Sequence, residues 1–389
     1  MRKVLFWLHL VAGLLAGVVI FIMSVTGVLL MYEKQTVAWF DLRGLPAIAG
    51  PERLPAEELL TRAREQKGKL PTAMQWAADP QVPVQLTMGR EIVYQDPSNG
   101  KIVGAGDLQV RAFFRTVTDW HRWLALSGEQ RPWGRSVTGY ANLAFLFLVL
   151  SGIYLWMPKV WTKARVRAVA LLQPGLAGKA RDFNWHNVFG IWAAVPLVLV
   201  VSCATVISFP WASNLVYSLT GTKPPAPAGA PAPASSGGAG AKAEEFAVAG
   251  LNALWSKAAG ASQGWRTLTM RLPAGNEQPV AFVLDHGYAG QPQKRLSFAL
   301  DRATGEMKNR ESFADFNQGR QIRTWMRFVH TGEYYGLLGQ SIAGIASAAA
   351  AVLVFTGIAL SLRRWKAWRG RKARSSTAAT AASEVLVER

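Results

Sequence analysis

Histidine is scarce in this chain of 389 residues, yet four of its five histidines lie close to the ends of long apolar stretches. These four are His9, His121, His186 and His330. A neutral imidazole is a common metal ligand, and ionisable groups at membrane depth are costly and usually functional. The four histidines are therefore the first candidates for chemistry, whereas His286 is predicted to be a surface residue.

Four apolar stretches are long enough to carry these histidines into a membrane. Half of the chain is apolar and only 17% is charged. A hydrocarbon core of about 30 Å takes roughly 20 helical residues. The sequence therefore predicts transmembrane helices at 4–31, 141–157, 188–211 and 337–362. The first stretch lacks a small-x-small cleavage motif near Tyr32, which favours an uncleaved signal anchor.

The placement of basic residues predicts how these helices are oriented. Lysine and arginine gather between the second and third stretches and again after the fourth, and such residues are retained on the cytoplasmic side. Both termini are therefore predicted to be cytoplasmic in the inner membrane of a bacterial cell, with the large segments periplasmic. These clusters, which suit contact with membrane lipid, explain much of the net charge of +19, so nucleic-acid binding is disfavoured.

The chain also repeats itself. "VYQDPSNGKIVG" at 93–104 corresponds to "SFALDRATGEMKN" at 297–309, and each predicts a β-hairpin that follows a helical stretch, at 55–68 or 246–260. Gly139 and Gly152 are 13 residues apart, as are Gly344 and Gly357. "HLVAG" in the first apolar stretch matches "HNVFG" in the third. The fold class predicted is an α-helical membrane protein with four transmembrane helices, a two-fold parallel internal repeat and two small α+β periplasmic domains.

The predicted organisation follows the chain in eight segments. They are a transmembrane helix at 1–32, a periplasmic domain with His121 at 33–136, a transmembrane helix at 137–158, a cytoplasmic loop at 159–185, a transmembrane helix at 186–211, a periplasmic domain at 212–336 with a flexible linker at 222–245, a transmembrane helix at 337–362, and a basic, disordered cytoplasmic tail at 363–389.

Depth sorts the histidines into two pairs. His9 and His186 lie near the cytoplasmic ends of their helices, and His121 and His330 lie on the periplasmic side. Two imidazoles from related helices can bind one iron from opposite sides of a planar macrocycle, so each pair predicts a bis-histidine haem site.

Neighbouring residues fit such a site. Gly13 and Gly190 follow His9 and His186 by one helical turn, so a porphyrin could lie against the backbone there. Arg122 and Arg327, beside the outer pair, could pair with haem propionates.

Plainer interpretations remain open for each of these residues. A histidine at a membrane boundary can be an interfacial polar residue, Gly-x-x-x-Gly can serve helix packing alone, and the nearby aromatic residues can form an interfacial belt. Zinc or copper could bind the same histidines, although no cysteine, carboxylate or methionine recurs beside all four. The single cysteine, Cys203, excludes a disulfide framework and is predicted to pack as a small apolar residue.

Several motifs together resemble a known family. "TDWHRWLAL", "WMRFVHTGEYYGLLGQ", "DFNWHNVFG" and two Asp-x-x-x-Gly hairpins are similar to the PepSY-associated transmembrane family, whose members include iron-regulated ferric-siderophore reductases of the inner membrane. The resemblance covers most of residues 1–365. It implies periplasmic PepSY-type domains, two b-type haems bound by His9, His121, His186 and His330, and electron delivery to the periplasm.

The function expected on this basis is a haem-dependent transmembrane ferric reductase. The inner haem, at His9 and His186, would take electrons from a cytoplasmic reductant or a quinol, because the chain has no Gly-rich dinucleotide fingerprint. The outer haem, at His121 and His330, would pass them to the iron of a ferric siderophore. Contact with this substrate is expected at Glu333, Tyr334 and Tyr335.

Two functions of other classes stay open. The periplasmic domains could be a non-catalytic binding or regulatory module that the helices merely anchor. Alternatively, the histidines could be way stations of a metal-ion transporter. Both alternatives predict a colourless protein, whereas the haem hypothesis predicts a cytochrome spectrum.

Overall fold

The structure, a computed structural model, describes residues 1–48, 50, 52–158, 160–225 and 246–387. It divides into two compact units. The first unit combines Met1–Met31, Arg115–Phe209 and Gln340–Arg389, and the second combines Tyr32–Phe114 and Pro210–Gly339. Of the predicted linker at 222–245, the part from 226 onward lies outside the described residues.

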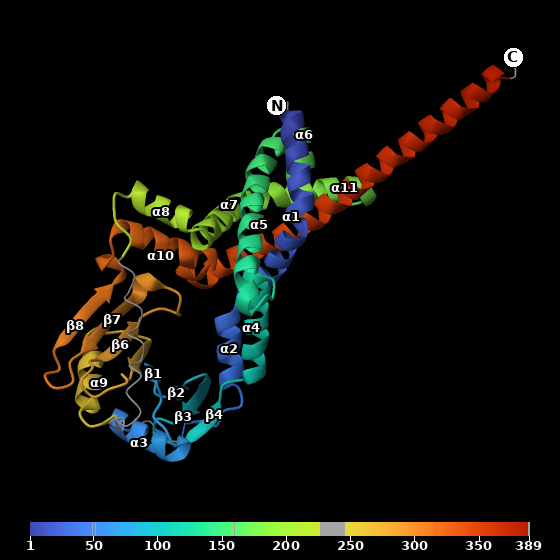
Figure 1. Cartoon of the computed structure of the whole chain (residues 1–389). Coiled ribbons are helices and arrows are strands. Elements are labelled where there is room, and N and C mark those ends of the chain that lie inside the picture. The colour runs from blue at the N-terminus through green and yellow to red at the C-terminus, as the bar shows by residue number, and fades with distance from the viewer. Residues whose placement is uncertain (49, 51, 159, 226–245, 388–389) are drawn as a thin grey trace. The chain divides into compact units, whose positions relative to one another are not determined.

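Four long helices dominate the first unit (Figure 1): α1 (Arg2–Leu30), α5 (Arg131–Trp156), α7 (Gly178–Ser208) and α11 (Gly336–Val387). All four are long and apolar enough to cross a membrane. Helices α5 and α7 begin before the apolar stretches that predict them, and α5 has a proline in its first turn, where proline is tolerated.

The side chains of the first unit arrange these helices in a closed cycle. Ala16 and Ile20 of α1 pack on Ala141 of α5, with Val354 of α11 against the same cluster. A second cluster joins α5, α7 and α11 around Leu197. Helices α1 and α7 therefore each lie between α5 and α11.

Two similar hydrogen bonds link α5 to α7 and α11 to α1. The Arg135 guanidinium of α5 donates to the carbonyl of Ser208 at the end of α7, over 3.3 Å. The Gln340 amide of α11 donates to the carbonyl of Met31 at the end of α1, over 2.7 Å. Each of α5 and α11 thus holds the terminus of a helix from the other half of the chain.

The outer surface of α1 is apolar over its whole length. Exposed side chains on this helix include Val4, Leu8, Val11, Leu15 and Val18. A helix that is apolar on all sides belongs in a protein core or a membrane, and among the residues that the structure describes these side chains are exposed. This surface suits contact with lipid.

The second unit is built on one antiparallel sheet of eight strands in the order β4-β3-β2-β1-β5-β6-β7-β8. The first half contributes β1 (Ala73–Ala77), β2 (Val84–Met88), β3 (Glu91–Gln95) and β4 (Ile102–Ala105). The second half contributes β5 (Thr267–Arg271), β6 (Val280–Asp285), β7 (Arg295–Leu300) and β8 (Met307–Ser312).

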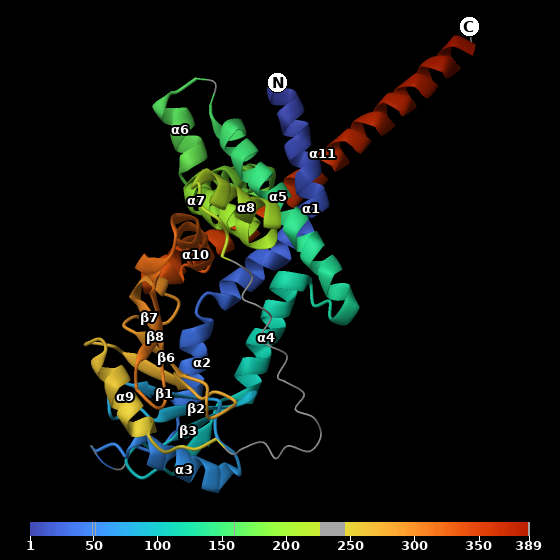
Figure 2. The ribbon, with the colours of Figure 1, turned by 60° about the vertical axis from the view of Figure 1, so that its left-hand side comes forward.

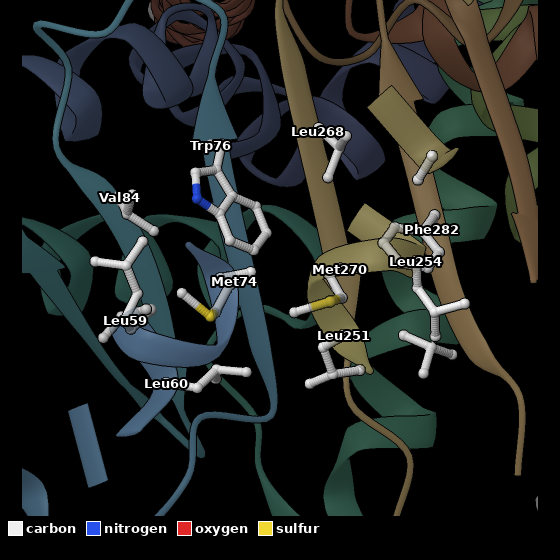
Figure 3. Close-up of a cluster of buried hydrophobic side chains, with 14 of the residues drawn as sticks. Leu59, Leu60, Met74, Trp76, Val84, Leu251, Leu254, Leu268, Met270 and Phe282 are labelled. Atoms are coloured by element: carbon white, nitrogen blue, oxygen red, sulfur yellow. The ribbon is translucent and has the colours of Figure 1, made fainter. Parts of the chain in front are cut away.

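Two helices cover one face of this sheet and close its core (Figure 3). They are α3 (Ala56–Lys67) and α9 (Leu251–Gly260), where the sequence predicts helical stretches. Leu59 and Leu60 of α3 and Leu251 of α9 pack on the strand residues Met74 and Met270. Alternation of buried and half-buried residues along β1, β2 and most of β5 turns one face of these strands to this core.

The single sheet differs from the two separate small domains that the sequence predicts. Strands β1 and β5 pair antiparallel, with Met74 opposite Met270 and Trp76 opposite Leu268. Each four-stranded half alone would leave the edge of β1 or β5 unpaired, and joining them satisfies both edges. Helices α3 and α9 are joined too, because the backbone N–H of Glu57 and that of Asn252 each donate to the other residue's side chain over 3.0 Å.

The two predicted hairpins are present. The carboxylate of Asp96 accepts from Ser98 and Asn99 between β3 and β4, and that of Asp301 accepts from the backbone of the turn between β7 and β8. Gly100 and Gly305 close these turns with φ of 68° and 66°, a conformation that favours glycine.

Shorter helices complete both units. They are α2 (Glu33–Leu42), α4 (Leu108–Trp123), α6 (Lys163–Ala170), α8 (Pro210–Leu219) and α10 (Gln318–His330), with 3₁₀ turns at Gly128–Gln130, Pro292–Lys294, Phe313–Asp315 and Glu333–Tyr335.

Two segments predicted to lack structure are partly helical. In Figure 2, α6 is a short helix in the connection between α5 and α7, which the sequence predicts only as a loop. Helix α11 continues through the basic tail to Val387, where disorder is predicted. The tail is rich in alanine, the residue with the strongest intrinsic preference for a helix.

Candidate functional site

His9 lies in the second turn of α1 and contacts α5. Its Nδ1 is 2.8 Å from the hydroxyl oxygen of Ser151. That hydroxyl is also 3.2 Å from the carbonyl of Leu148 in its own helix. The next residue, Gly152, has no side chain, and a Cβ there would lie 3.5 Å from the Cε1 edge of the ring. The imidazole is therefore held by α5 through one nitrogen and one ring edge.

His186 is held in the same way by α11. Its Nδ1 is 2.9 Å from the hydroxyl oxygen of Thr356, which donates to the carbonyl of Val352 over 2.7 Å. Gly357 follows, and a Cβ there would lie 3.4 Å from the ring Cε1. The carbonyl of Leu353 lies 3.2 Å from the same hydroxyl.

His121, on α4, contacts the opposite end of α1. Its Nδ1 is 2.9 Å from the hydroxyl oxygen of Thr26, which donates to the carbonyl of Ile22 over 2.6 Å. A Cβ on Gly27 would lie 3.6 Å from the ring Cε1. Three histidines of the first unit therefore share one arrangement, a hydroxyl on Nδ1 and a glycine beside Cε1.

The direction of donation in these contacts assigns the ring nitrogens. A hydroxyl has one proton, and Thr26 and Thr356 place it on a carbonyl of the preceding turn. Their oxygens can then only accept, so the Nδ1–H of each imidazole donates to them. A neutral imidazole that donates from Nδ1 carries its lone pair on Nε2, the nitrogen that would bind a metal.

His9 and His186 lie on α1 and α7, and both of these helices pack against α5 and α11. The pairing of His9 with His186 stays a prediction. His330 ends α10 in the second unit, and His121 lies in the first. The pairing of His121 with His330 stays a prediction.

The two glycines predicted to face a cofactor lie against leucines. A Cβ on Gly13 would be 3.8 Å from Leu148 of α5, and one on Gly190 would be 3.6 Å from Leu353 of α11. Both distances are ordinary van der Waals contacts. These glycines therefore occupy equivalent positions in the two halves, and a methyl group would fit at either in this structure.

The basic residues near the histidines contact aromatic rings. The guanidinium carbon of Arg122 lies 4.5 Å from the centre of the Trp123 ring, and that of Arg131 lies 3.6 Å from it. Arg327 is 5.8 Å from the Phe328 ring in the second unit. Arg181, near the inner pair, forms an ion pair of 2.8 Å with the buried Asp182. The predicted role of Arg122 and Arg327 at propionates stays a prediction.

The residues predicted to contact substrate are part of the second unit. Glu333 forms an ion pair of 2.7 Å with Lys34. The carbonyl of Tyr334 accepts from Gln293 over 3.0 Å, and burial, with the neighbouring Tyr335, raises the pKa of the Tyr334 phenol. The ring of Tyr335 is 58% exposed, which leaves it accessible to a ligand.

Sequence reasoning missed the residues that hold the histidines. A signal was present, because Thr26, Ser151 and Thr356 each immediately precede a glycine within an apolar stretch. It was hidden because small residues at such spacing are also typical of helix packing. Sequence reasoning also placed His286 at the surface, whereas the ring is half-buried and bonded to Ser262 over 3.0 Å.

The histidines do not sit in a conventional multi-ligand metal site. Within the described residues, no group of three or more His, Cys, Asp or Glu side chains could hold a metal ion. Cys203 is fully buried in α7. Zinc sites usually take three or four protein ligands.

Comparison with known proteins agrees with this architecture of four spans and a sheet. The model of the PepSY-associated TM region matches residues 6–364, which include both units and all four histidines. No curated protein matches the chain. With a match over nearly its whole length, this multi-pass membrane protein belongs to the PepSY-associated transmembrane family.

Proposed function

We propose that the protein carries electrons across the bacterial inner membrane and reduces ferric siderophore iron in the periplasm. In this proposal His9 and His186 bind one b-type haem, and His121 and His330 bind a second. The observation that carries the proposal is the shared arrangement of three imidazoles, each with a hydroxyl oxygen within 2.9 Å of its Nδ1.

The donor set supports haem over other metal groups. When bound, haem would supply one-electron transfer and would need only two ligands from the protein. Each proposed pair offers two neutral imidazoles, one from each half of the chain. Among the residues described, no group of three or more ligating side chains is found. Two histidines suffice for a haem, whereas a zinc site usually needs at least three protein ligands.

Matching contacts support a two-fold parallel repeat of the membrane helices. His9 on Ser151 and His186 on Thr356 are equivalent, and so are the links of Arg135 to α7 and of Gln340 to α1. Such a repeat would place two helices of each half around a common axis, so that equivalent histidines approach each other.

The positions of His9 and Thr26 along α1 support two haem sites at different depths in the membrane. His9 and Thr26, which holds His121, are about 25 Å apart along the helix at about 1.5 Å per residue. This separation is close to the thickness of the hydrocarbon core. The protein would thus hold one redox site near each membrane surface and shield the path between them from water.

Basic residues support an inner level at the cytoplasmic side. The Arg2 guanidinium donates to the carbonyl of Leu155 over 2.6 Å, and Arg363 forms an ion pair of 3.0 Å with Asp182. These contacts gather the positively charged ends of all four helices on the side of His9 and His186. By the positive-inside rule this side is cytoplasmic, and the sheet, with its PepSY-type halves, is periplasmic.

Haem held by the inner and outer histidine pairs would supply one-electron transfer from a cytoplasmic reductant or a quinol to Fe(III). One electron converts Fe(III) to Fe(II), whose bonds to hard oxygen ligands are weaker, so the siderophore releases it. Glu333, Tyr334 and Tyr335 are the residues of the second unit proposed to contact this substrate. The residues of the chain position the redox sites and exclude water, and they transfer no protons in this scheme.

An absorption spectrum of the purified full-length protein tests the proposal. The proposal predicts a Soret band and split α-bands after reduction with dithionite, and loss of the reduced spectrum when a ferric siderophore is added. A chelator that binds Fe(II) should report one iron released per electron. A colourless protein from haem-replete cells would favour a binding module or a metal-ion transporter, and a coloured protein that ferric siderophore does not reoxidise would contradict the proposed substrate.

A further inference from the structure

The three hydroxyl groups that contact histidine rings have no assigned role. We infer that Ser151, Thr356 and Thr26 are positioning residues, which fix the imidazoles of His9, His186 and His121 as Nδ1–H tautomers and direct Nε2 to the metal. This inference rests on the proposed function, because it assumes that these histidines bind haem iron.

The first support is recurrence across different helix pairs. The contact joins α1 to α5, α7 to α11 and α4 to α1, over 2.8, 2.9 and 2.9 Å. In all three it is Nδ1, not Nε2, that meets the hydroxyl oxygen. In all three the hydroxyl residue is followed by a glycine whose Cα hydrogens face the ring Cε1. General packing of small residues does not explain why the same ring nitrogen is chosen each time.

The second support is the burial of the hydroxyl residues. Thr356 is 0% exposed, Ser151 5% and Thr26 8%. Hydrogen bonds are stronger in a medium of low dielectric, and a buried polar group left without its partner is costly. Each hydroxyl therefore favours one ring orientation and one tautomer before any metal binds.

The third support is the proton count. Thr356 and Thr26 place their own protons on carbonyls 2.7 and 2.6 Å away, so each hydroxyl oxygen is an acceptor toward the ring. An imidazole that donates from Nδ1 becomes a better electron donor at Nε2, as in the second shells of metal sites. A stronger donor stabilises the ferric state, so these bonds should lower the midpoint potential of each site.

The clearest test is at Thr356, where one substitution removes the hydroxyl and keeps the shape. Thr356→Val is nearly isosteric, and Thr356→Ser restores the hydroxyl. Thr205→Val is the matched control. Thr205, on α7, is buried like Thr356, and its hydroxyl likewise donates to a carbonyl of its own helix, over 3.0 Å. It accepts from Asn142 rather than from a histidine.

Two measurements on the purified full-length protein report the role. In the haem-loaded protein, Thr356→Val should raise the midpoint potential of one of the two sites and weaken haem retention there by about 10- to 100-fold. Thr356→Ser and Thr205→Val should match the wild type. In the apo-protein, ¹⁵N NMR of labelled histidine should show the Nδ1–H tautomer for His186, and Thr356→Val should shift it toward the Nε2–H tautomer that free imidazole prefers.

The outcomes separate the inference from the proposed function. If the wild type binds haem but Thr356→Val equals Thr205→Val in potential, retention and tautomer, the inference is wrong while the haem proposal stands. If the wild type binds no haem, the proposed function fails, and the NMR result still decides the tautomer. Should Thr356→Val not fold, an Nε2–H tautomer for His186 in the wild-type apo-protein would overturn the inference.

Discussion

At the scale of single residues, the candidate site consists of histidine rings and the hydroxyl groups that contact them. Sequence alone identified the four histidines, because ionisable residues in apolar stretches are rare. It could not identify Ser151 or Thr356 as their partners, since a hydroxyl in a membrane helix usually bonds its own backbone. Only the approach of a second helix shows that the oxygen also accepts from a ring.

Glu33, at the start of α2, gives a pH-dependent prediction in the second unit. Burial and then the charge of Glu333 raise the pKa of Glu33, against the influence of Lys34. The folded state therefore holds the proton more tightly than the unfolded state, so the contribution of Glu33 to stability is present at low pH and is lost as the pH rises through the raised pKa.

Glu33→Gln should accordingly raise the midpoint of thermal unfolding at about pH 7 and leave it nearly unchanged at about pH 4. Thermal unfolding in detergent, followed by circular dichroism at both pH values, measures this difference. Glu65→Gln, an exposed position on α3, controls for the loss of one carboxylate. A lower midpoint for Glu33→Gln at neutral pH would contradict the stated burial effect.

At the scale of elements, local patterns predicted most helices and both hairpins, but not how the halves join. Apolar length predicted α1, α5, α7 and α11, and the Asp-x-x-x-Gly pattern predicted two turns. Nothing local signals that β1 pairs with β5, because the two strands are far apart in the chain and each reads as an ordinary half-buried strand. Pairing of β1 with β5 joins the two four-stranded halves into one sheet.

A cross-link tests this pairing in the full-length protein. Gln75 and Thr269 lie opposite each other on β1 and β5, so Gln75→Cys with Thr269→Cys should form a disulfide. With a protease site inserted in 226–245, the cleaved protein should run as one band without reductant and as two bands with it.

A second pair provides the control for the cross-link. Thr87 is on β2, which lies on the other side of β1 from β5, about 10 Å away across two strand spacings. This exceeds the reach of a disulfide, which is about 7 Å between Cα atoms. Equal cross-linking of Thr87→Cys and Gln75→Cys to Thr269→Cys would contradict the sheet order.

At the scale of the whole molecule, the family and the four spans agree with the expectation from sequence, and the function is a proposal. The chain is a membrane protein with four candidate spans and belongs to the PepSY-associated transmembrane family. Electron transfer across the membrane requires that the four histidines work as two pairs at different depths. His9, His121 and His186 lie in the first unit and His330 lies in the second, and their pairing is part of the proposal.

The haem content of four single variants tests this central claim most directly. His9→Ala, His186→Ala, His121→Ala and His330→Ala are purified from haem-replete cells beside the wild type and assayed by pyridine haemochrome and by reduced α-band spectra. The account predicts two haems per wild-type chain, with the same α-band lost in His9→Ala and His186→Ala and the other band lost in His121→Ala and His330→Ala. Loss of the same band in His9→Ala and His330→Ala, or full haem content in all four variants, would contradict it.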